Sequence, residues 1–240
     1  VEIIDTELIL ADMATVQSRL DKAKRSAKGG DKPDKARVEV LEKMAAWLDE
    51  GHSARSLQLE ENQTELLRAS HLLTMKKVLF VANVAADDLG QDNQYVTTLR
   101  EFAASQNSEV VVVCGSIESE LAELEEEEQQ EMLEGLGIEE PALNLLVRTT
   151  YGLLGLQSYF TAGPKEIRAW TIPVGASAQQ AAGTIHTDFA KHFNRAEVYT
   201  VGDLEEYGSE TAIKSAGRMR LEGRDYIVLD GDILHIRHSA

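Results

Sequence analysis

The stretch "KKVLFVANVAADD" (Lys76–Asp88) is a run of apolar residues that leads into a polar loop headed by Asn83. A continuous apolar run is typical of a strand buried on both faces of a sheet, predicted here over residues 78–81. A helix predicted over residues 93–105 separates it from a second apolar run, "SEVVVVCGS" (Ser108–Ser116). Strand, helix and strand in this order predict an α/β domain, in which ligands bind beside the loops that follow the strands.

The first 75 residues carry a helical pattern instead. Apolar residues recur at spacings of 4, 3, 4, 3 and 4, which make a heptad seam: Ile9, Met13, Val16, Leu20, Ala23 and Ala27. The segment "GGDKPD" (Gly29–Asp34) interrupts the seam, and a spacing of 3, 4 and 3 resumes afterwards at Val38, Leu41, Ala45 and Leu48. Two helices joined by a short turn predict an antiparallel hairpin, and a third helical stretch is predicted over residues 60–73.

The last segment changes character. A strand is predicted in "EIRAWTIPVG" (residues 166–175), a helix capped by Ser177 over residues 177–193, and a strand in "AEVYTV" (residues 196–201). The stretch "DYIVLDGDILHI" predicts a hairpin, because Asp230-Gly231 suits a two-residue turn. These elements predict a small α+β roll of the β-grasp kind, which is a binding module without a catalytic motif of its own.

The charge of the chain is unevenly spread. The 240 residues carry 24 Lys and Arg against 41 Asp and Glu, a net charge of −17. The excess is −3 over residues 1–75, −12 over residues 76–151 and −2 over residues 152–240. The two flanks are therefore close to neutral and can bind nucleic acid locally.

No apolar run approaches the ~18 residues that a membrane span needs, so we expect no membrane partner. The single cysteine, Cys114, cannot form an internal disulfide, and a reducing, cytoplasmic setting is expected. Eight glutamates lie between Glu118 and Glu131. We interpret them as the solvated face of a helix whose leucines, Leu121, Leu124 and Leu133, turn inward, and we predict no metal site there.

Several motifs carry a resemblance to a known family: "IDTEL" (Ile4–Leu8), "ELILAD" (Glu7–Asp12), "AKGGDK" (Ala27–Lys32), "LFVANV" (Leu79–Val84) and "YFTAGPKEIRAWTIPVGASAQQAAGTIHTDF" (Tyr159–Phe189). Together they resemble the C-terminal two-thirds of the YchF-type Obg-like ATPases, a branch of the P-loop GTPase superfamily that contains a TGS domain. The last motif is the most specific, and the resemblance covers nearly the whole chain.

The resemblance implies a fold class of α/β plus α+β in three parts. Residues 1–75 are expected to form a helical coiled-coil hairpin insertion, and residues 76–151 the distal part of the nucleotide-binding G domain. Residues 152–240 are expected to form a C-terminal β-grasp TGS domain. Because the chain starts with Val1 inside a helical pattern, we expect it to be a piece of something longer.

The phosphate-binding half of a nucleotide site is missing from this sequence. No Gly-x-x-x-x-Gly-Lys-Ser/Thr occurs, and "AKGGDK" lies in a helix–helix turn with no preceding strand, so it cannot cradle phosphates. In the family the phosphate loop and the Mg²⁺-holding residue precede the insertion. The resemblance therefore implies ATP with Mg²⁺ in the complete protein, with no catalytic residue and no metal ligand in this chain. We expect that this chain alone does not hydrolyse ATP.

The base-reading half matches the family only in part. Guanine-specific relatives carry Asn-Lys-x-Asp and YchF-type proteins Asn-x-x-Glu, whereas this chain has Asn83, Val84, Ala85 and Ala86. The nearest carboxylate, Asp87, comes one residue too late. The loss of the guanine-reading acid argues against GTP preference, and the missing Glu leaves the choice between ATP and GTP open.

In this interpretation Asn83 serves as donor and acceptor toward the N6/N7 edge of adenine. Val84 supplies backbone groups and an apolar wall, and the loop Cys114, Gly115 and Ser116 flanks the base. The alternative is that Asn83 is only a turn residue at the end of a strand.

The resemblance also implies ribosome or RNA binding, with no DNA specificity. Candidate contacts are cations of the hairpin tip and of the C-terminal segment: Lys28, Lys32, Lys35, Arg168, His186, Lys214, Arg218 and Arg220. Such cations act mainly through counterion release. Alternatively they belong to solvated helix faces, and His186, predicted in a helix, satisfies a neighbouring backbone group or carboxylate.

The implied function is therefore that of an ATPase that binds adenine nucleotide and associates with the ribosome in translation. Two alternatives stay open: a non-enzymatic ribosome- or RNA-binding adaptor, and a coiled-coil protein–protein scaffold.

Overall fold

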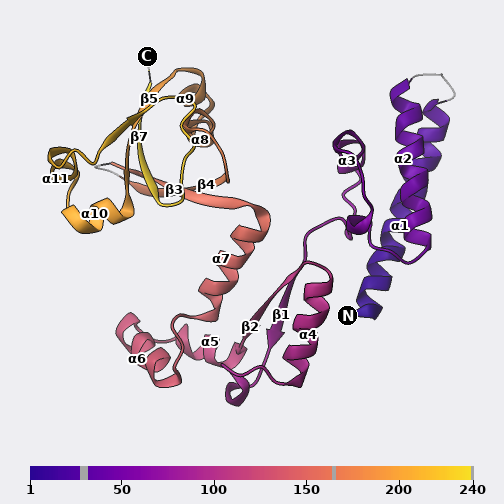
Figure 1. Ribbon diagram of the computed structural model, residues 1–240, viewed down its shortest axis with the longest axis horizontal. Coiled ribbons are helices and arrows are strands. Elements are labelled where there is room, and N and C mark those ends of the chain that lie inside the picture. The colour runs from indigo at the N-terminus through magenta and orange to yellow at the C-terminus, as the bar shows by residue number, and fades with distance from the viewer. Residues whose placement is uncertain (28–31, 164–165, 239–240) are drawn as a thin grey trace. The chain divides into compact units, whose positions relative to one another are not determined.

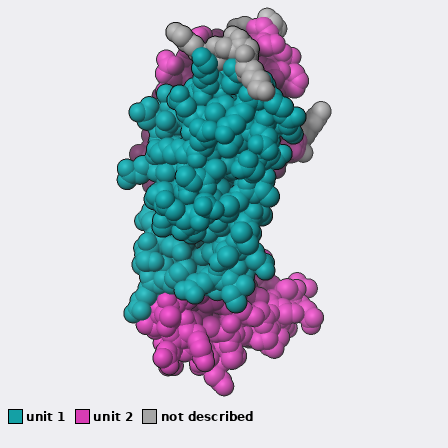
Figure 2. Space-filling model, turned by 90° about the vertical axis from the view of Figure 1, so that its right-hand side faces the viewer, with its two compact units in different colours: residues 1–80, 100–109 teal, residues 81–99, 110–240 magenta. Residues whose placement is uncertain are grey.

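The computed structural model describes residues 1–27, 32–163 and 166–238 (Figure 1). The chain divides into two compact units (Figure 2). Unit 1 comprises residues 1–80 and 100–109, and unit 2 comprises residues 81–99 and 110–240. Within the described parts of the chain, no helix is both long and apolar enough to cross a membrane.

Unit 1 is built on two long helices, α1 (Glu2–Ser26) and α2 (Lys32–Asp49), which pack against each other. The heptad positions Ile9, Val16, Leu20 and Ala23 of α1 are buried in one hydrophobic core, as the seam predicted. On α2, Leu41 and Leu48 are buried as predicted, and Val40 and Met44 are buried beside them. The turn predicted at "GGDKPD" begins in residues outside the described part.

The third helix, α3 (Glu61–Arg68), is shorter than the predicted stretch of residues 60–73. The chain that follows α3 is held by hydrogen bonds to Asp12 of α1, a residue that is only 2% exposed. Asp12 accepts hydrogen bonds from the backbone N–H groups of Leu73 and Thr74 and from the Thr74 hydroxyl, each at 2.7 Å. Backbone donors that bond to a carboxylate cannot extend a helix, so the prediction was wrong at this end.

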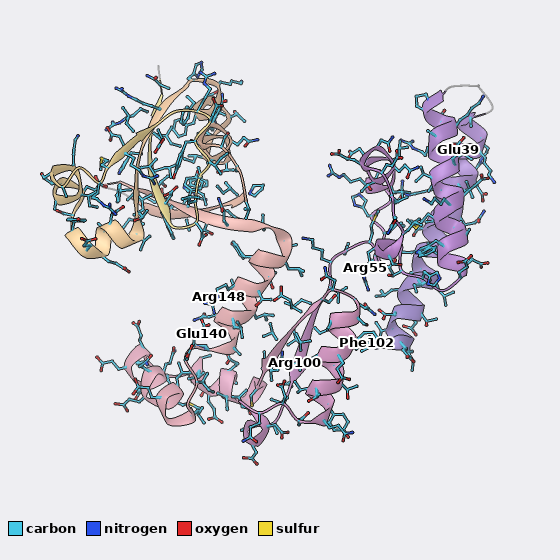
Figure 3. The ribbon with its side chains drawn as sticks, viewed as in Figure 1. Glu39, Arg55, Arg100, Phe102, Glu140 and Arg148 are labelled. Carbon is cyan, nitrogen blue, oxygen red and sulfur yellow. The ribbon has the colours of Figure 1, made fainter. Side chains whose placement is uncertain are left out.

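Arg55, in the short 3₁₀ turn η2 (Ala54–Ser56), joins three segments of unit 1 (Figure 3). Its guanidinium donates to the carbonyl oxygens of Thr74, at 3.3 Å, and Lys76, at 3.4 Å. It also donates to Gln106 Oε1 at 3.1 Å. The helical part of unit 1 is thus tied both to the segment that enters strand β1 and to the residue that follows helix α4.

We expect Arg55→Ala to lower the free energy of unfolding of unit 1 by about 2 kcal/mol, because three acceptors lose a charged donor. Urea denaturation measures the change. Arg37→Ala, which removes an exposed guanidinium from α2, is the matched control and should change stability by less than about 0.5 kcal/mol. Equal effects of the two substitutions would contradict the assignment.

Strands β1 (Leu79–Asn83) and β2 (Glu109–Val113) form a two-stranded sheet. Between them lie the 3₁₀ turn η3 (Ala86–Asp88) and helix α4 (Gln94–Ser105), whose first turn is capped by the Asn93 side chain. The second strand is shorter than predicted, because helix α5 (Gly115–Leu121) starts within the run predicted as strand. The strand–helix–strand order itself is confirmed.

The glutamate-rich segment forms two helices rather than one, α5 and α6 (Glu126–Leu136). Glu125 begins a new helix with a capping box, in which its side chain accepts the Glu128 N–H and the Glu128 side chain accepts the Glu125 N–H. Leu121 and Leu133 are buried as predicted. Helix α7 (Ala142–Leu154) follows, and its first N–H groups, on Ala142 and Leu143, donate to the Glu118 carboxylate.

The C-terminal part of unit 2 is a five-stranded sheet in the order β4-β3-β7-β5-β6 (Figure 1). Its strands are β3 (Leu156–Ala162), β4 (Ile167–Pro173), β5 (Phe193–Thr200), β6 (Arg220–Glu222) and β7 (Asp232–His238). Only β3 and β7 run parallel, while the β3–β4, β5–β7 and β5–β6 pairs are antiparallel. Strand β3 was not predicted.

Four short helices accompany this sheet: α8 (Ala178–Ile185), α9 (Thr187–Lys191), α10 (Val201–Tyr207) and α11 (Glu210–Ser215). Ser177 caps α8 as predicted, but the helix predicted over residues 177–193 breaks at His186, where the backbone is extended. The alanines of α8 share one core with Tyr159 and Val198, and Ile213 of α11 lies in another with Tyr199 and Ile233.

The predicted hairpin around Asp230-Gly231 is wrong. Gly231 does turn the chain, with φ of +80°, and β7 follows it, but the segment from 225 to 229 is not a strand. Asp232 explains the difference, because its buried carboxylate accepts hydrogen bonds from the Tyr226 hydroxyl and the Leu229 N–H. Strand β7 pairs instead with β5 and β3.

Tyr159 is fully buried in this sheet, and its hydroxyl donates to the Ala181 carbonyl oxygen at 2.8 Å. Burial raises the pKa of Tyr159 from 10.0 to about 12. The neutral phenol therefore stabilises the fold fully below pH 10, and this contribution is lost as the pH rises toward 12. We expect a loss of roughly 3 kcal/mol across that interval, measured by urea denaturation at each pH. The Tyr159→Phe variant should not lose this part of its stability between pH 10 and pH 12. An identical dependence of unfolding free energy on pH in the two proteins would contradict the prediction.

Candidate functional site

The two loops predicted to form a base-reading site lie together in unit 2. Asn83 ends β1, and the Gly115 N–H at the start of α5 donates to Asn83 Oδ1 at 3.0 Å. Just beside this bond, the Val84 N–H donates to the Val113 carbonyl oxygen at 2.8 Å. The chain segments that carry Asn83-Val84 and Cys114-Gly115-Ser116 are therefore fixed to each other by two hydrogen bonds.

The bond to Gly115 defines how the Asn83 amide is oriented. Oxygen and nitrogen of an amide are assigned from such contacts, and an N–H donor at 3.0 Å identifies the nearer atom as Oδ1. Asn83 is exposed, and its Nδ2 remains as the hydrogen-bond donor of this side chain. The sequence predicted that Asn83 acts as donor and acceptor alike, whereas here its oxygen already serves the loop.

The three residues of the second loop differ in exposure. Cys114 is 2% exposed and packs in a core with Ile117, Leu121 and Leu133. Its Sγ lies 3.2 Å from Ser116 Oγ, and this hydrogen bond lowers the pKa of the thiol. Gly115 and Ser116 are exposed. Any contact from Cys114 to a ligand therefore comes from its backbone, and Gly115 and Ser116 present the accessible surface.

The residues that depart from the family pattern are also accessible. Ala86 and Asp87 are exposed and lie in the turn η3, directly after the Asn83 loop. The Asp88 N–H donates to the Ala85 carbonyl oxygen at 3.0 Å, which closes this turn. No carboxylate therefore occupies the fourth position of the loop.

The basic candidates at the hairpin tip are only partly described. Lys28 lies outside the described residues, and the side chain of Lys32 at the start of α2 does too. Lys35 is exposed. It lines a shallow hollow of about 330 Å³ together with Lys24, Ala27, Val38 and Glu39, and Lys24 pairs with Glu42 at 2.7 Å.

The candidates of the C-terminal segment make more contacts with the protein than expected. The Arg168 guanidinium lies 4.3 Å from the centre of the Trp170 ring. His186 is exposed, and its Nδ1 accepts the Asp188 N–H at 3.2 Å. His186 thus caps α9 and does not lie within a helix, which corrects the prediction.

Two of the arginines are engaged in ion pairs. Arg218 Nε donates to Asp203 Oδ1 at 3.0 Å, and Arg220 Nη2 donates to the buried Asp232 at 3.2 Å. The hydroxyl and backbone N–H of Thr200 and then the Arg218 pair lower the pKa of Asp203. Arg220 also lies over the Tyr226 ring at 5.2 Å. Lys214, in the last turn of α11, is exposed.

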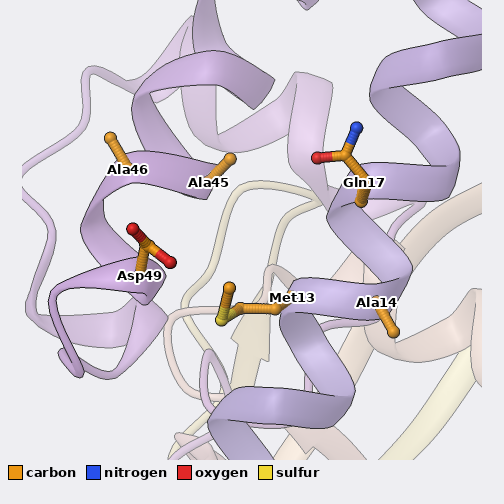
Figure 4. Close-up of a pocket in the computed structure, with 6 residues that line it drawn as sticks. All are labelled: Met13, Ala14, Gln17, Ala45, Ala46 and Asp49. Carbon is orange, nitrogen blue, oxygen red and sulfur yellow. The ribbon is translucent and has the colours of Figure 1, made fainter.

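A second shallow hollow, of about 470 Å³, lies between α1 and α2 (Figure 4). Its lining is apolar apart from one amide and one carboxylate: Met13, Ala14, Gln17, Ala45, Ala46 and Asp49. This hollow belongs to unit 1 and is separate from the Asn83 loop. Its small alanines leave space at the helix pair, and we assign no ligand to it.

Comparison with known proteins places the chain in a family. Residues 156–239 match the family model YchF-GTPase_C, described as "Protein of unknown function (DUF933)". The chain is 46% identical over 240 residues to the "Ribosome-binding ATPase YchF" of Haemophilus influenzae, covering all of this chain and 66% of that protein. The protein of the same name from Bacillus subtilis is 46% identical over 242 residues, with the same coverages.

More distant relatives agree. "Obg-like ATPase 1" of Rattus norvegicus is 37% identical over 246 residues, and the match covers all of this chain and 62% of that protein. The solved structure of the Schizosaccharomyces pombe YchF GTPase matches with a TM-score of 0.83 at 30% identity, over 98% of this chain and 64% of that one. The chain spans about two thirds of the length of these relatives, and it belongs to the YchF family.

Proposed function

We propose that this chain supplies the base-reading loop and the ribosome-contacting parts of an ATPase that acts on ribosomes in the cytoplasm. In this proposal residues 1–75 are a coiled-coil hairpin insertion and residues 76–151 the distal part of a G domain. Residues 152–240 are a TGS domain of the β-grasp kind. The carrying observation is the bond between Asn83 and Gly115, which assembles two loops from the ends of neighbouring strands.

Base recognition follows from the groups that face solvent at this loop. The Asn83 Nδ2 is a donor, and N7 is an acceptor on both purines, so Asn83 selects purines over pyrimidines. Discrimination between the purines falls to the fourth loop position. With Ala86 there, the N1–H and amino group of guanine lack the carboxylate acceptor that guanine-specific sites provide. Adenine lacks those two donors and is favoured.

ATP in this proposal binds with Mg²⁺, which supplies charge neutralisation at the phosphates. Within the described parts of the chain, no three His, Cys, Asp or Glu side chains gather as a metal site requires. Our proposal places no metal ligand and no step of hydrolysis on this chain, because its sequence contains no Gly-x-x-x-x-Gly-Lys-Ser/Thr motif. Its own contribution is to bind and orient the base.

Asn83→Ala, made in the longest form of the protein that its cells produce, should weaken ATP binding roughly tenfold, since one donor to the base is lost and the loop bond to Gly115 with it. Isothermal titration calorimetry gives the dissociation constants. Asn144→Ala, which removes an exposed amide from α7, is the control and should leave ATP binding unchanged. Unchanged ATP affinity in Asn83→Ala would contradict the base-reading role.

The adaptor alternative gives a different result in a second experiment. If the protein is only an RNA-binding adaptor, its affinity for ribosomes should be the same with ATP, with ADP and with no nucleotide. In our proposal ribosome affinity depends on the nucleotide bound. Sedimentation with purified ribosomes at one fixed salt concentration measures this, because the affinity of basic surfaces for RNA changes steeply with salt.

A further inference from the structure

Two arginines lie opposite each other on two neighbouring strands of the C-terminal sheet. Strands β5 and β7 are antiparallel neighbours (Figure 1). Their register places Arg195 directly opposite Arg237. The next pair on the same face is Glu197 with His235, because side chains on one face of a strand alternate. Directly opposed side chains in such a pair have Cβ atoms roughly 5 Å apart. The two arginine side chains therefore start from neighbouring points on the sheet surface.

A β-bulge places Phe193 and Arg195 on opposite faces of the sheet. The register shifts between Phe193 and Arg195, so Asn194 is an extra residue without a partner on β7. Phe193 consequently points into the core beneath α8, where it is 4% exposed, together with Ala196 and Val198. Without the bulge, Phe193 and Arg195 would share a face. Bulges that re-aim a side chain are over-represented beside functional sites.

The pair is not neutralised by the protein. Like charges directly opposite each other destabilise a sheet. Arg237 donates to Glu197 at 2.9 Å and its side chain remains 60% exposed. Arg195 is exposed, and its side chain has no hydrogen bond or ion pair with any residue that the structure describes. Glu197 thus pairs with Arg237 and Glu210 pairs with His235 on the same face, and the Arg195 guanidinium is left without a carboxylate partner among the described residues.

We propose that Arg195 and Arg237 together bind a backbone phosphate of RNA, an inference that rests on the proposed ribosome association and names its contact surface. A guanidinium presents parallel N–H donors that match a phosphate group, and a shared anion removes the repulsion between the two cations. An open sheet face is also a surface on which single-stranded RNA lies in other RNA-binding modules.

This site differs from the arginine candidates that the sequence suggested. Arg218 and Arg220 already donate to the buried carboxylates Asp203 and Asp232. The positive charge of each guanidinium is therefore balanced by a carboxylate of the protein. Arg195 has no such partner in the described chain. On the same face of β5, Tyr199 packs with Ile213 of α11, whereas Arg195 is exposed.

The test compares charge removal at this face with the same charge removal elsewhere. Arg195→Ala/Arg237→Ala, in the whole chain, should bind a 20-nucleotide uridine RNA and purified ribosomes roughly tenfold more weakly than the unaltered protein at 100 mM salt. The dependence of log affinity on log salt should become shallower by about 0.7 for each phosphate that the variant no longer binds. Lys191→Ala/Arg224→Ala, two exposed cations of the same unit, should retain full affinity.

Folding is controlled by the single variant Arg195→Ala. It relieves the cross-strand repulsion, so its melting temperature should equal or exceed that of the unaltered protein while its RNA affinity falls. Equal RNA affinity of the double variant and the unaltered protein would overturn the inference and leave the proposed function standing. No binding of RNA or ribosomes by the unaltered protein would overturn both.

The ligand class is tested with polyglutamate as a competitor. RNA binding that survives excess polyglutamate supports a phosphate site. If polyglutamate binds the unaltered protein tightly and loses affinity in the double variant while RNA does not, the face recognises acidic peptide and the RNA assignment is wrong.

Discussion

Replacing Asp12 with Ala is expected to lower the free energy of unfolding of unit 1 by about 3–5 kcal/mol. Three donors bond to this carboxylate, from the backbone of Leu73 and from the backbone and hydroxyl of Thr74. Each buried donor left without a partner costs roughly 1–3 kcal/mol. Thr74 also accepts the Ala54 N–H at 2.9 Å, so its displacement disturbs the turn that carries Arg55.

Urea denaturation followed by circular dichroism measures the Asp12 effect, and hydrogen exchange locates it. The amides of Leu73 and Thr74 should lose protection first, because they donate directly to the missing carboxylate. Asp21→Ala is the matched control, since Asp21 lies on the same helix, is exposed, and its carboxylate accepts an exposed hydrogen bond from Gln17. If Asp12→Ala lowers the free energy of unfolding by less than about 1 kcal/mol, the segment that carries Leu73 and Thr74 is held by other contacts.

Asp232→Ala should destabilise the C-terminal sheet by a similar amount, about 3–5 kcal/mol. Its carboxylate is fully buried and accepts bonds from Arg220, the Tyr226 hydroxyl and the Leu229 N–H. Removal of the carboxylate leaves the Arg220 guanidinium without its buried partner. The segment from 225 to 229, which has an isolated bridge between Ile227 and Ser177, loses its bonds from Tyr226 and Leu229 to the residue that begins β7.

The decisive comparison for Asp232 is Asp225→Ala, which removes an exposed carboxylate from the same segment and should be close to neutral. Thermal unfolding of both variants gives the difference. The Arg220→Ala/Asp232→Ala double variant should be less destabilised than the sum of the single variants, because it leaves no unpaired charge. Strict additivity would mean that the ion pair does not hold the segment.

Periodicity and capping motifs in the sequence correctly predicted those elements whose buried face is determined by packing against a single other element. The seam of α1 is such a case, since α2 is the element against which α1 mainly packs. On α2 the periodicity missed Val40 and Met44, because α3 packs against α2 as well and widens its buried face. The capping residues Ser177 and Asn93 act within one turn of chain.

What could not be predicted depends on contacts between distant residues. Strand β3 has no clear alternation of its own and forms because β4 and β7 pair with it on both sides. The hairpin prediction failed because the Asp232 carboxylate holds the segment before it. The bonds from Glu118 to the start of α7 and from Arg55 to Gln106 join residues 24 and 51 positions apart. The Asn194 bulge, which separates Phe193 from Arg195, likewise follows from pairing and leaves no local signal.

For the candidate site, the sequence suggested both loops, and the structure brings them together through the Asn83–Gly115 bond. The orientation of the Asn83 amide could not be predicted, because it depends on a donor 32 residues away. The burial of Cys114 was likewise set by packing against Ile117 and Leu133. The Gly115 N–H uses one of the two lone pairs of Asn83 Oδ1, and donation from Nδ2 toward a purine stays our proposal for this side chain.

The central claim is that the Asn83 loop reads adenine because no carboxylate stands at its fourth position. The most direct measurement is the ratio of ATP to GTP affinity by calorimetry, in the natural full-length protein and in its Ala86→Asp variant. We expect the unaltered protein to favour ATP and the variant to shift at least tenfold toward GTP, since guanine's two donors gain an acceptor. Equal affinity for both nucleotides, unchanged by Ala86→Asp, would contradict the account.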